Sequence, residues 1–120
     1  MNTEKHKWHR HLFQAVIDNC IEIFEQNRYA DKVIQSNLKQ HNKWGARDRA
    51  FVAQHTYDMV RWYRLLKTIS GANEQPSKGD WWQMLAALRW WQQQPLPDWT
   101  EFRQIDFRGF EKKLKEASTT

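Results

Sequence analysis

The chain has 120 residues, a formal net charge of +5 and a pI near 9.5. Its length suits one domain that buries a core without a metal, and its single cysteine excludes an internal disulfide. The polar, basic start MNTEKHKWHRH excludes a signal peptide, and no later apolar run could span a bilayer. We therefore expect a soluble, cytoplasmic protein with no membrane partner, whose basic balance favours a polyanion.

Apolar periodicity predicts three helices in the first 70 residues. The first, about residues 12–27, has a broad apolar face and an acidic outer face. A shorter helix is expected over residues 30–40. The third, about residues 47–70, is the longest. Asp48 lies in its first turn, where a carboxylate suits the helix dipole, and Gly71 is placed to end it.

The remaining residues predict further helices separated by turns. SGANEQPSKGD reads as a loop, with Asp80 as the N-cap of a helix through WWQMLAALRWWQQQ. Asp98 or Thr100 is expected to cap a short turn that carries Phe102, and Asp106 to cap a final helix. No alternating strand pattern and no repeat is present. The sequence therefore predicts an all-α bundle of about five to six helices, with the first and third at its centre.

Groups that could perform catalysis are scarce in this sequence. Cys20 falls on the apolar face of the first helix, which indicates packing rather than a nucleophile. His6, His9 and His11 lie in a basic tail without a second pair of ligands, so we expect no metal site there. His55 is expected to be packed and hydrogen-bonded. A glycine-rich phosphate loop and a paired-cysteine zinc motif are both missing from the sequence.

The basic residues gather in the N-terminal tail, at the start of the third helix and in the last helix. Those that could form one basic surface are Lys5, Lys7, Arg10, Lys43, Arg47, Arg49, Arg61 and Arg64. Arginine forks match phosphate oxygens, and counterion release supplies affinity without reading a base sequence. The alternative is a solvated charged face with local ion pairs, such as one between Asp58 and Arg61.

Eight tryptophans in so short a chain indicate packing, interface anchors or base-stacking surfaces. Two Trp-Trp pairs lie in the fourth predicted helix, at 81–82 and 90–91. One Trp of each pair is expected inside, and the other outward or against a neighbouring element. We assign Trp90 and Trp91 to contacts with a partner or a further domain, in preference to base stacking.

Four segments resemble a known family. They are R-x-L-F-x-A-V-I-D from Arg10 to Asp18, ADKVI at 30–34, WGARDRAFV at 44–52 and TYDMVRW at 56–62. Together they are similar to the N-terminal NusB-like domain of the Sun/Fmu (RsmB-like) rRNA cytosine-C5 methyltransferases. The hallmark of that domain, an aspartate and arginine followed by an aromatic, a valine and an arginine, is matched by Asp48, Arg49, Tyr57, Val60 and Arg61.

The resemblance implies a specific biochemical role. Such enzymes transfer a methyl group from S-adenosylmethionine to carbon 5 of a cytosine in small-subunit rRNA, in a domain that this sequence does not contain. Residues 1–120 are then one non-catalytic, NusB-like RNA-binding domain from the N-terminus of a longer enzyme. The expected partners are ribosomal RNA and the missing catalytic domain; no cofactor or metal is expected in this chain.

The same resemblance assigns roles to individual residues. The RNA contacts it implies are Arg10, Arg47, Arg49 and Arg61, to which we add Lys43 from the basic surface, while Phe51, Tyr57 and Val60 would hold the fold. Trp62 follows Arg61 and could cover it, so RNA suits Arg47 better than Arg61. Three alternatives stay open: a stand-alone domain without a catalytic half, an interaction module of NusB type for transcription or ribosomal proteins that uses the Trp-rich half, and a small enzyme.

Overall fold

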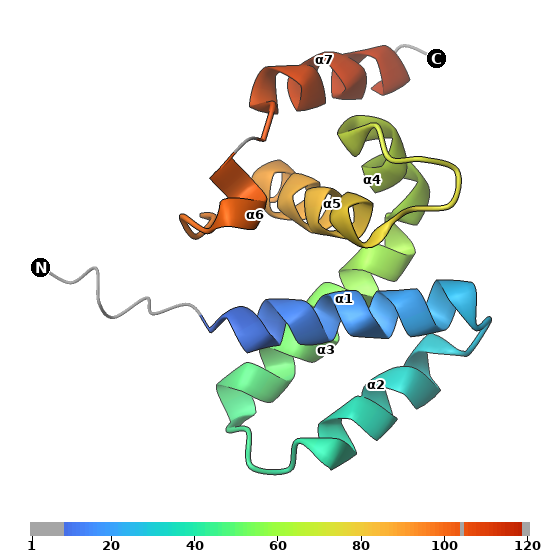
Figure 1. Cartoon of the computed structure of the whole chain (residues 1–120), viewed down its shortest axis with the longest axis vertical. Coiled ribbons are helices and arrows are strands. Elements are labelled where there is room, and N and C mark those ends of the chain that lie inside the picture. Colours follow the sequence, from blue (N-terminus) through green and yellow to red (C-terminus); the bar gives the residue numbers. More distant parts are fainter. Residues whose placement is uncertain (1–8, 104, 119–120) are drawn as a thin grey trace, which may run out of the picture. The chain divides into compact units, whose positions relative to one another are not determined.

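The computed structural model describes residues 9–103 and 105–118. Within these ranges every regular element is a helix, which confirms the all-α prediction (Figure 1). They are α1 (Arg10–Glu25), α2 (Ala30–Gln40), α3 (Ala46–Arg61), α4 (Tyr63–Ser70), α5 (Lys78–Trp91), α6 (Thr100–Arg103) and α7 (Phe107–Ser118). Among the described helices, none has both the length and the apolar character that a membrane span requires.

The chain forms two compact units, Met1–Thr56 and Tyr57–Thr120, and the division falls inside α3. The described part has seven helices because the long helix expected over residues 47–70 is interrupted. At Trp62 the backbone leaves helical values, with φ −105° and ψ 21°, and α4 begins at the next residue. The interpretation of residues 1–120 as one NusB-like domain stays a prediction.

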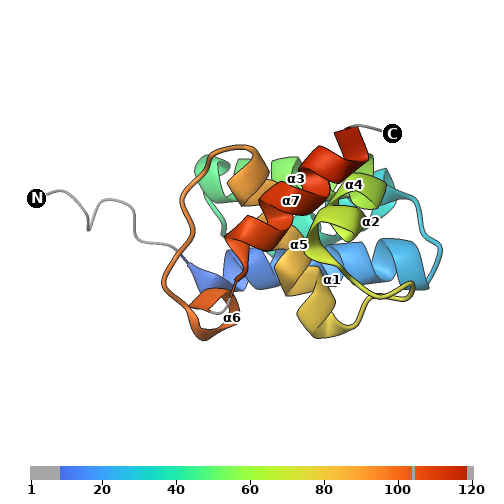
Figure 2. The same ribbon diagram turned by 90° about the horizontal axis from the view of Figure 1, so that it is seen from above.

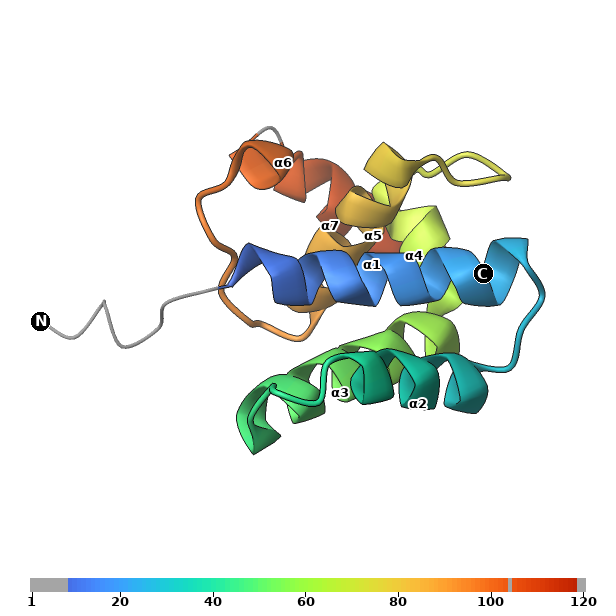
Figure 3. The same ribbon diagram turned by 60° about the horizontal axis from the view of Figure 1, so that its bottom comes forward.

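In the first unit, α2 packs along α1 (Figure 3), and Phe51 and Thr56 of α3 contact side chains of α1. The rings of Phe13 and Phe51 lie 5.1 Å apart between centroids. Deeper in, the amide of Asn19 donates a 3.3 Å hydrogen bond to the hydroxyl of Thr56, and both side chains are buried. Cys20 is fully buried, and burial raises the pKa of its thiol, which confirms that it packs in the core.

The turn between α1 and α2 depends on an asparagine with positive φ. Asn27 has φ 55°, a left-handed conformation that asparagine tolerates better than most residues. Directly after it, the backbone N–H of Arg28 bonds to the carbonyl of Ile23, and its guanidinium pairs with Glu22 at 2.6 Å. The first contact satisfies the Ile23 carbonyl at the end of α1, and both hold the chain where it turns into α2.

The second unit is built around α4 and α5, with α7 packed on α4 and α6 on α5 (Figure 2). Gly71 ends α4 with φ 72°, as predicted. A Cβ at Gly71 would displace the mobile ammonium end of Lys113, from α7, so a larger residue is opposed mainly by the positive φ. Asp106 caps α7, as predicted, by accepting a 2.9 Å hydrogen bond from the N–H of Gly109.

The tryptophan-rich α5 is buried around most of its circumference. Trp81 and Trp82 are both buried, so neither faces outward, and Trp82 takes the other expected arrangement, against a neighbouring element. Trp82 is covered because Phe102 of α6 lies edge-on to it, with centroids 5.6 Å apart. Tyr57, expected to hold the fold, is 44% exposed, so its ring lies outside the core.

The start of α5 lies three residues earlier than its sequence predicts. Ser77 is the N-cap and Asp80 is the third helical residue, and the two form a reciprocal capping box. The Asp80 carboxylate also accepts hydrogen bonds from the N–H and the amide of Asn73, at 3.3 and 3.1 Å. Partial burial favours the neutral carboxyl, but the hydrogen bonds from Ser77 and Asn73 outweigh it and lower the pKa of Asp80.

Asp80→Ala is expected to lower the free energy of unfolding by about 1 kcal/mol at neutral pH, because the cap is lost. A carboxyl whose native pKa is lowered stabilises the fold above its ordinary value of 3.8 and loses that contribution as the pH falls through its native value. The difference in the free energy of unfolding between variant and wild type, measured by urea titration, should therefore become smaller below pH 3.8. Glu111→Ala, at an exposed site, is the control; an Asp80→Ala effect that is constant down to pH 2 would contradict the assignment.

Candidate nucleic-acid interface

The C-terminal end of α2 and the turn into α3 organise the polar surface of the first unit. His41 ends α2, and its backbone N–H bonds to the carbonyls of Asn37 and Leu38 at 3.1 and 3.2 Å. The chain then turns, and the backbone N–H of Trp44 bonds to the carbonyl of His41 at 3.1 Å. The two rings stack with centroids 4.1 Å apart and planes within 4°. This turn places an aromatic layer beside α1.

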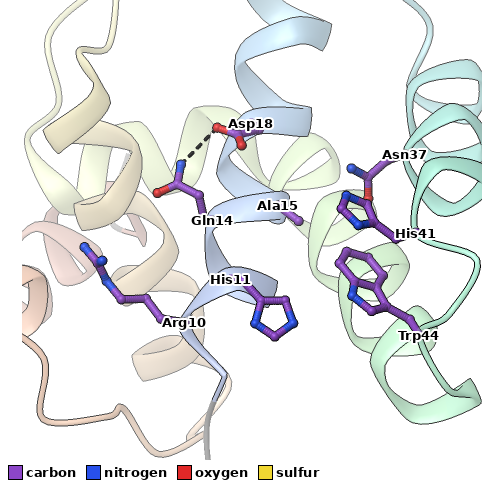
Figure 4. Close-up of a pocket in the computed structure, with 8 residues that line it drawn as sticks. All are labelled: Arg10, His11, Gln14, Ala15, Asp18, Asn37, His41 and Trp44. Atoms are coloured by element: carbon purple, nitrogen blue, oxygen red, sulfur yellow. Dashed lines mark hydrogen bonds between the residues drawn. The ribbon is translucent and has the colours of Figure 1, made fainter.

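An aromatic pocket lies between α1 and this layer, with a volume of about 340 Å³. Figure 4 shows His11 and Ala15 on the α1 side, facing Asn37, His41 and Trp44, while Arg10 points away from the aromatic rings. The residues that line it are Arg10, His11, Gln14, Ala15, Asp18, Asn37, His41 and Trp44. The amide of Gln14 donates to Asp18 at 2.9 Å, so these two side chains restrain one another.

Asn37 is the residue of this pocket that has a buried polar atom without a hydrogen-bond partner among the described residues. Its Oδ1 atom is buried and accepts no hydrogen bond from the described residues. Buried carbonyl oxygens nearly always have a partner, so this atom can accept a donor that the described residues do not supply. A carbonyl acceptor beside stacked rings suits a flat ligand with an N–H at its edge.

A basic pocket lies against the other side of α2, with a volume of about 540 Å³. It is lined by Lys32, Gln35, Ser36, Leu38, Lys39 and Arg49. Spacings of three and four residues bring the polar members from α2 onto one helix face. Arg49 enters from α3, and none of these lining residues carries a carboxylate. The pocket therefore concentrates positive charge.

Arg49 has a structural task besides any contact with a ligand. One of its terminal nitrogens donates to the carbonyls of Leu38 and His41, at 3.1 and 3.4 Å. These carbonyls lie at the end of α2 and each also accepts one backbone N–H, from His41 and Trp44 respectively, so the guanidinium supplies a second donor to each. The guanidinium is thereby fixed between α2 and α3, and its other N–H groups keep their directions.

Arg49→Met is expected to destabilise the first unit by about 1 kcal/mol, because hydrogen bonds from a charged donor to the α2 carbonyls are lost and solvent partly replaces them. Urea unfolding measures the loss, and amide exchange should quicken at the end of α2. Arg47→Met, at an exposed neighbouring site, should stay within about 0.5 kcal/mol of wild type. Equal effects of the two variants would show that the C-terminal contact does not stabilise α2.

The structure separates the residues that sequence reasoning selected for RNA. Arg10 lines the aromatic pocket and Arg49 the basic pocket, while Lys43 and Arg47 are exposed and line neither pocket. Arg61 belongs to the second unit, is exposed, and holds its guanidinium 5.2 Å from the centroid of the Trp62 ring. Lys5, Lys7 and His6 lie outside the described residues.

Several pocket residues were missed by the sequence reasoning. Lys32 and Lys39 are seven residues apart, which is two helical turns, so the helix prediction for residues 30–40 already placed them on one face. His41 and Trp44 carried no such signal, because only the fold of the turn brings their rings together. Asn37 could not be identified from the sequence either, because the burial of its oxygen depends on the packing of α1 and α2.

Trp90 and Trp91 are both half-buried within the second unit. The ring of Trp90 is edge-on to Phe110 at 5.7 Å, and that of Trp91 to Trp62 at 4.9 Å. Each therefore faces a neighbouring element, as expected for one member of the pair, but neither is fully buried, as was expected for the other. Their assignment to a partner or a further domain stays a prediction.

The described residues bring together no group of three or more His, Cys, Asp or Glu side chains that could hold a metal ion. His9 and His11 are neighbours, with centroids 5.5 Å apart, but a structural zinc site needs four ligands. His55 bonds through Nδ1 to the carbonyl of Phe51 at 2.8 Å and stacks on its ring, which confirms the expected packed histidine.

Comparison with known proteins finds no family model, no curated protein and no solved structure that matches this chain. The resemblance to the rRNA methyltransferases therefore stays a prediction from the quoted segments.

Proposed function

We propose that this chain is a non-catalytic RNA-binding domain whose first unit holds RNA by its phosphates. The observation that carries the proposal is the basic pocket, where Lys32, Lys39 and Arg49 come together with Gln35 and Ser36. Ammonium and guanidinium groups bind phosphate oxygens, and amide and hydroxyl groups add neutral donors. Release of condensed counterions would supply the affinity.

A polymeric anion suits this surface better than a small one. Lys43 and Arg47 are exposed between the end of α2 and the first turn of α3, so positive charge continues along the chain beyond the pocket. A single phosphate would leave these cations unused, whereas successive phosphates of an RNA strand can meet several of them. The net charge of +5 is consistent with such a partner.

The nature of the parent protein rests on the resemblance alone. From the segments at 10–18, 30–34, 44–52 and 56–62 we propose a small-subunit rRNA cytosine-C5 methyltransferase. S-adenosylmethionine and the catalytic cysteines would belong to a separate catalytic domain. In this proposal the present chain supplies binding and orientation of rRNA.

The test is fluorescence anisotropy of the chain with a labelled single-stranded fragment of small-subunit rRNA, repeated at rising salt. We expect binding whose logarithmic affinity falls linearly with the logarithm of salt concentration, because each phosphate contact releases a counterion. Absence of binding at low salt would overturn the proposal. An affinity that does not change with salt concentration would show that phosphate contacts do not supply the binding.

A further inference from the structure

We propose that the aromatic pocket is a binding site for one unpaired nucleobase, so that the chain prefers single-stranded RNA to a duplex. The inference rests on the proposed RNA binding and adds to it the kind of RNA that is bound. It depends on three features of the pocket: an aromatic layer, a hydrogen-bond acceptor without a partner among the described residues, and a volume of suitable size.

The aromatic layer supplies the stacking surface. His41 and Trp44 are stacked in parallel, and His11 lies beside Trp44, with centroids 6.0 Å apart and the rings tilted. An unpaired base has two flat faces and gains affinity by stacking on aromatic rings. A paired base exposes neither face, because its neighbours in the helix cover both, so a duplex gains nothing here.

The acceptor is Oδ1 of Asn37, which is buried and accepts no hydrogen bond from the described residues. Each nucleobase carries an N–H on the edge that it uses for pairing, and this edge is free only in an unpaired base. A base that stacks in the pocket can direct this N–H to Asn37. The acceptor therefore favours an unpaired base, because the same N–H is already used for base pairing in a duplex.

The space is suitable because α1 presents a small side chain there. Ala15 faces Asn37 and His41 across the pocket, and only its methyl group projects from α1 at that point (Figure 4). The resulting volume, about 340 Å³, falls within the range of about 300–1,000 Å³ common for small-molecule pockets. Arg10 also lines the pocket, but its guanidinium points away from the aromatic rings, so we assign it no contact with the base.

The first experiment detects the base directly, with the whole chain and cytidine 5′-monophosphate followed by nitrogen-edited NMR. The side-chain amide signals of Asn37 and the indole signal of Trp44 are expected to shift. Ribose 5-phosphate, which has no base, should leave both signals in place. The Trp44 signal is identified by its loss in Trp44→Leu. Absence of these shifts, or equal shifts with ribose 5-phosphate, would overturn the base site.

The second experiment compares a labelled single strand of RNA with a duplex of the same length. Trp44→Leu and His41→Ala should each weaken the single strand by about tenfold and leave duplex binding unchanged. His41 is exposed, so its replacement preserves the fold even if that of half-buried Trp44 does not. Equal losses for both RNAs, or no loss, would contradict the inference.

The outcomes separate this inference from the proposed function. If RNA binding depends on salt but is unchanged in both Trp44→Leu and His41→Ala, the base site is contradicted and the RNA-binding proposal stands. Shifts with cytidine 5′-monophosphate in a chain that binds no RNA would have the opposite meaning, since the base site would then serve a free nucleotide.

Discussion

The double variant Lys32→Gln/Lys39→Gln is expected to bind the rRNA fragment more weakly, with a salt slope smaller by about 1.4. Each phosphate contact to a single strand contributes about 0.7 to the slope, and the variant removes two. Glutamine retains most of the length and polarity of lysine, so the α2 face stays hydrated. Both lysines are exposed, and their loss should leave stability within about 0.5 kcal/mol of wild type.

Arg108→Gln/Lys112→Gln is the matched control, because it removes the same two charges from exposed positions of α7 in the second unit. Its salt slope should stay near that of wild type. A loss as large as that of the α2 variant would show that binding follows net charge rather than the basic pocket. Unchanged binding of the α2 variant would remove the basic pocket as the phosphate contact.

Arg89→Ala is expected to lower the free energy of unfolding by about 3 kcal/mol or more, the largest effect on stability of any variant considered. Arg89 is only 2% exposed, and its Nε and Nη2 both donate to the carbonyl of Pro95, at 2.9 and 2.8 Å. Alanine removes both bonds and leaves a cavity where the long side chain was. The α5–α6 connection would also lose the contact that holds it against α5.

Burial lowers the pKa of Arg89 to about 10, so the group stays charged at neutral pH and its charge opposes burial. The paired hydrogen bonds to Pro95 offset this penalty, which is why a carbonyl can keep an arginine inside the unit. Arg89→Lys should therefore be intermediate, because an ammonium can donate to the carbonyl but lacks the fork.

Urea unfolding of Arg89→Ala and Arg89→Lys, with Arg103→Ala as control, measures these differences. Arg103 is exposed and pairs with Asp98 at 3.3 Å, so its loss should change stability by about 0.5 kcal/mol or less. An Arg89→Ala variant as stable as Arg103→Ala would show that the Pro95 contact does not hold the connection in place.

The number of tryptophans has a largely structural explanation in the second unit. Trp81 and Trp82 are buried, and Trp90, Trp91 and Trp62 each contact another aromatic ring of the same unit. Large rings bury much area per residue, which suits a unit this small. In the first unit the ring of Trp44 lines a pocket beside polar groups, and this is the tryptophan that we connect with RNA.

The sequence by itself determined much of the local structure of this protein, although not the break between α3 and α4 at Trp62. The apolar period predicted α2 with its observed bounds, and Gly71 and Asp106 marked the end of α4 and the start of α7. Such signals are local because a cap or a left-handed glycine acts on backbone groups within one turn. Asp80 was misassigned for the same reason, since a capping box has two reciprocal members and either can be taken for the cap.

Only the tertiary structure decided how the candidate site is composed. Arg49 was predicted to contact RNA, but the fold also gives it the carbonyls at the end of α2. The basic pocket needs α3 beside α2, and the aromatic pocket needs the turn that stacks His41 on Trp44 opposite Ala15. These contacts join residues whose spacing in the chain carries no helical period. They form because packing α1, α2 and α3 around an apolar core determines which polar side chains meet at its surface.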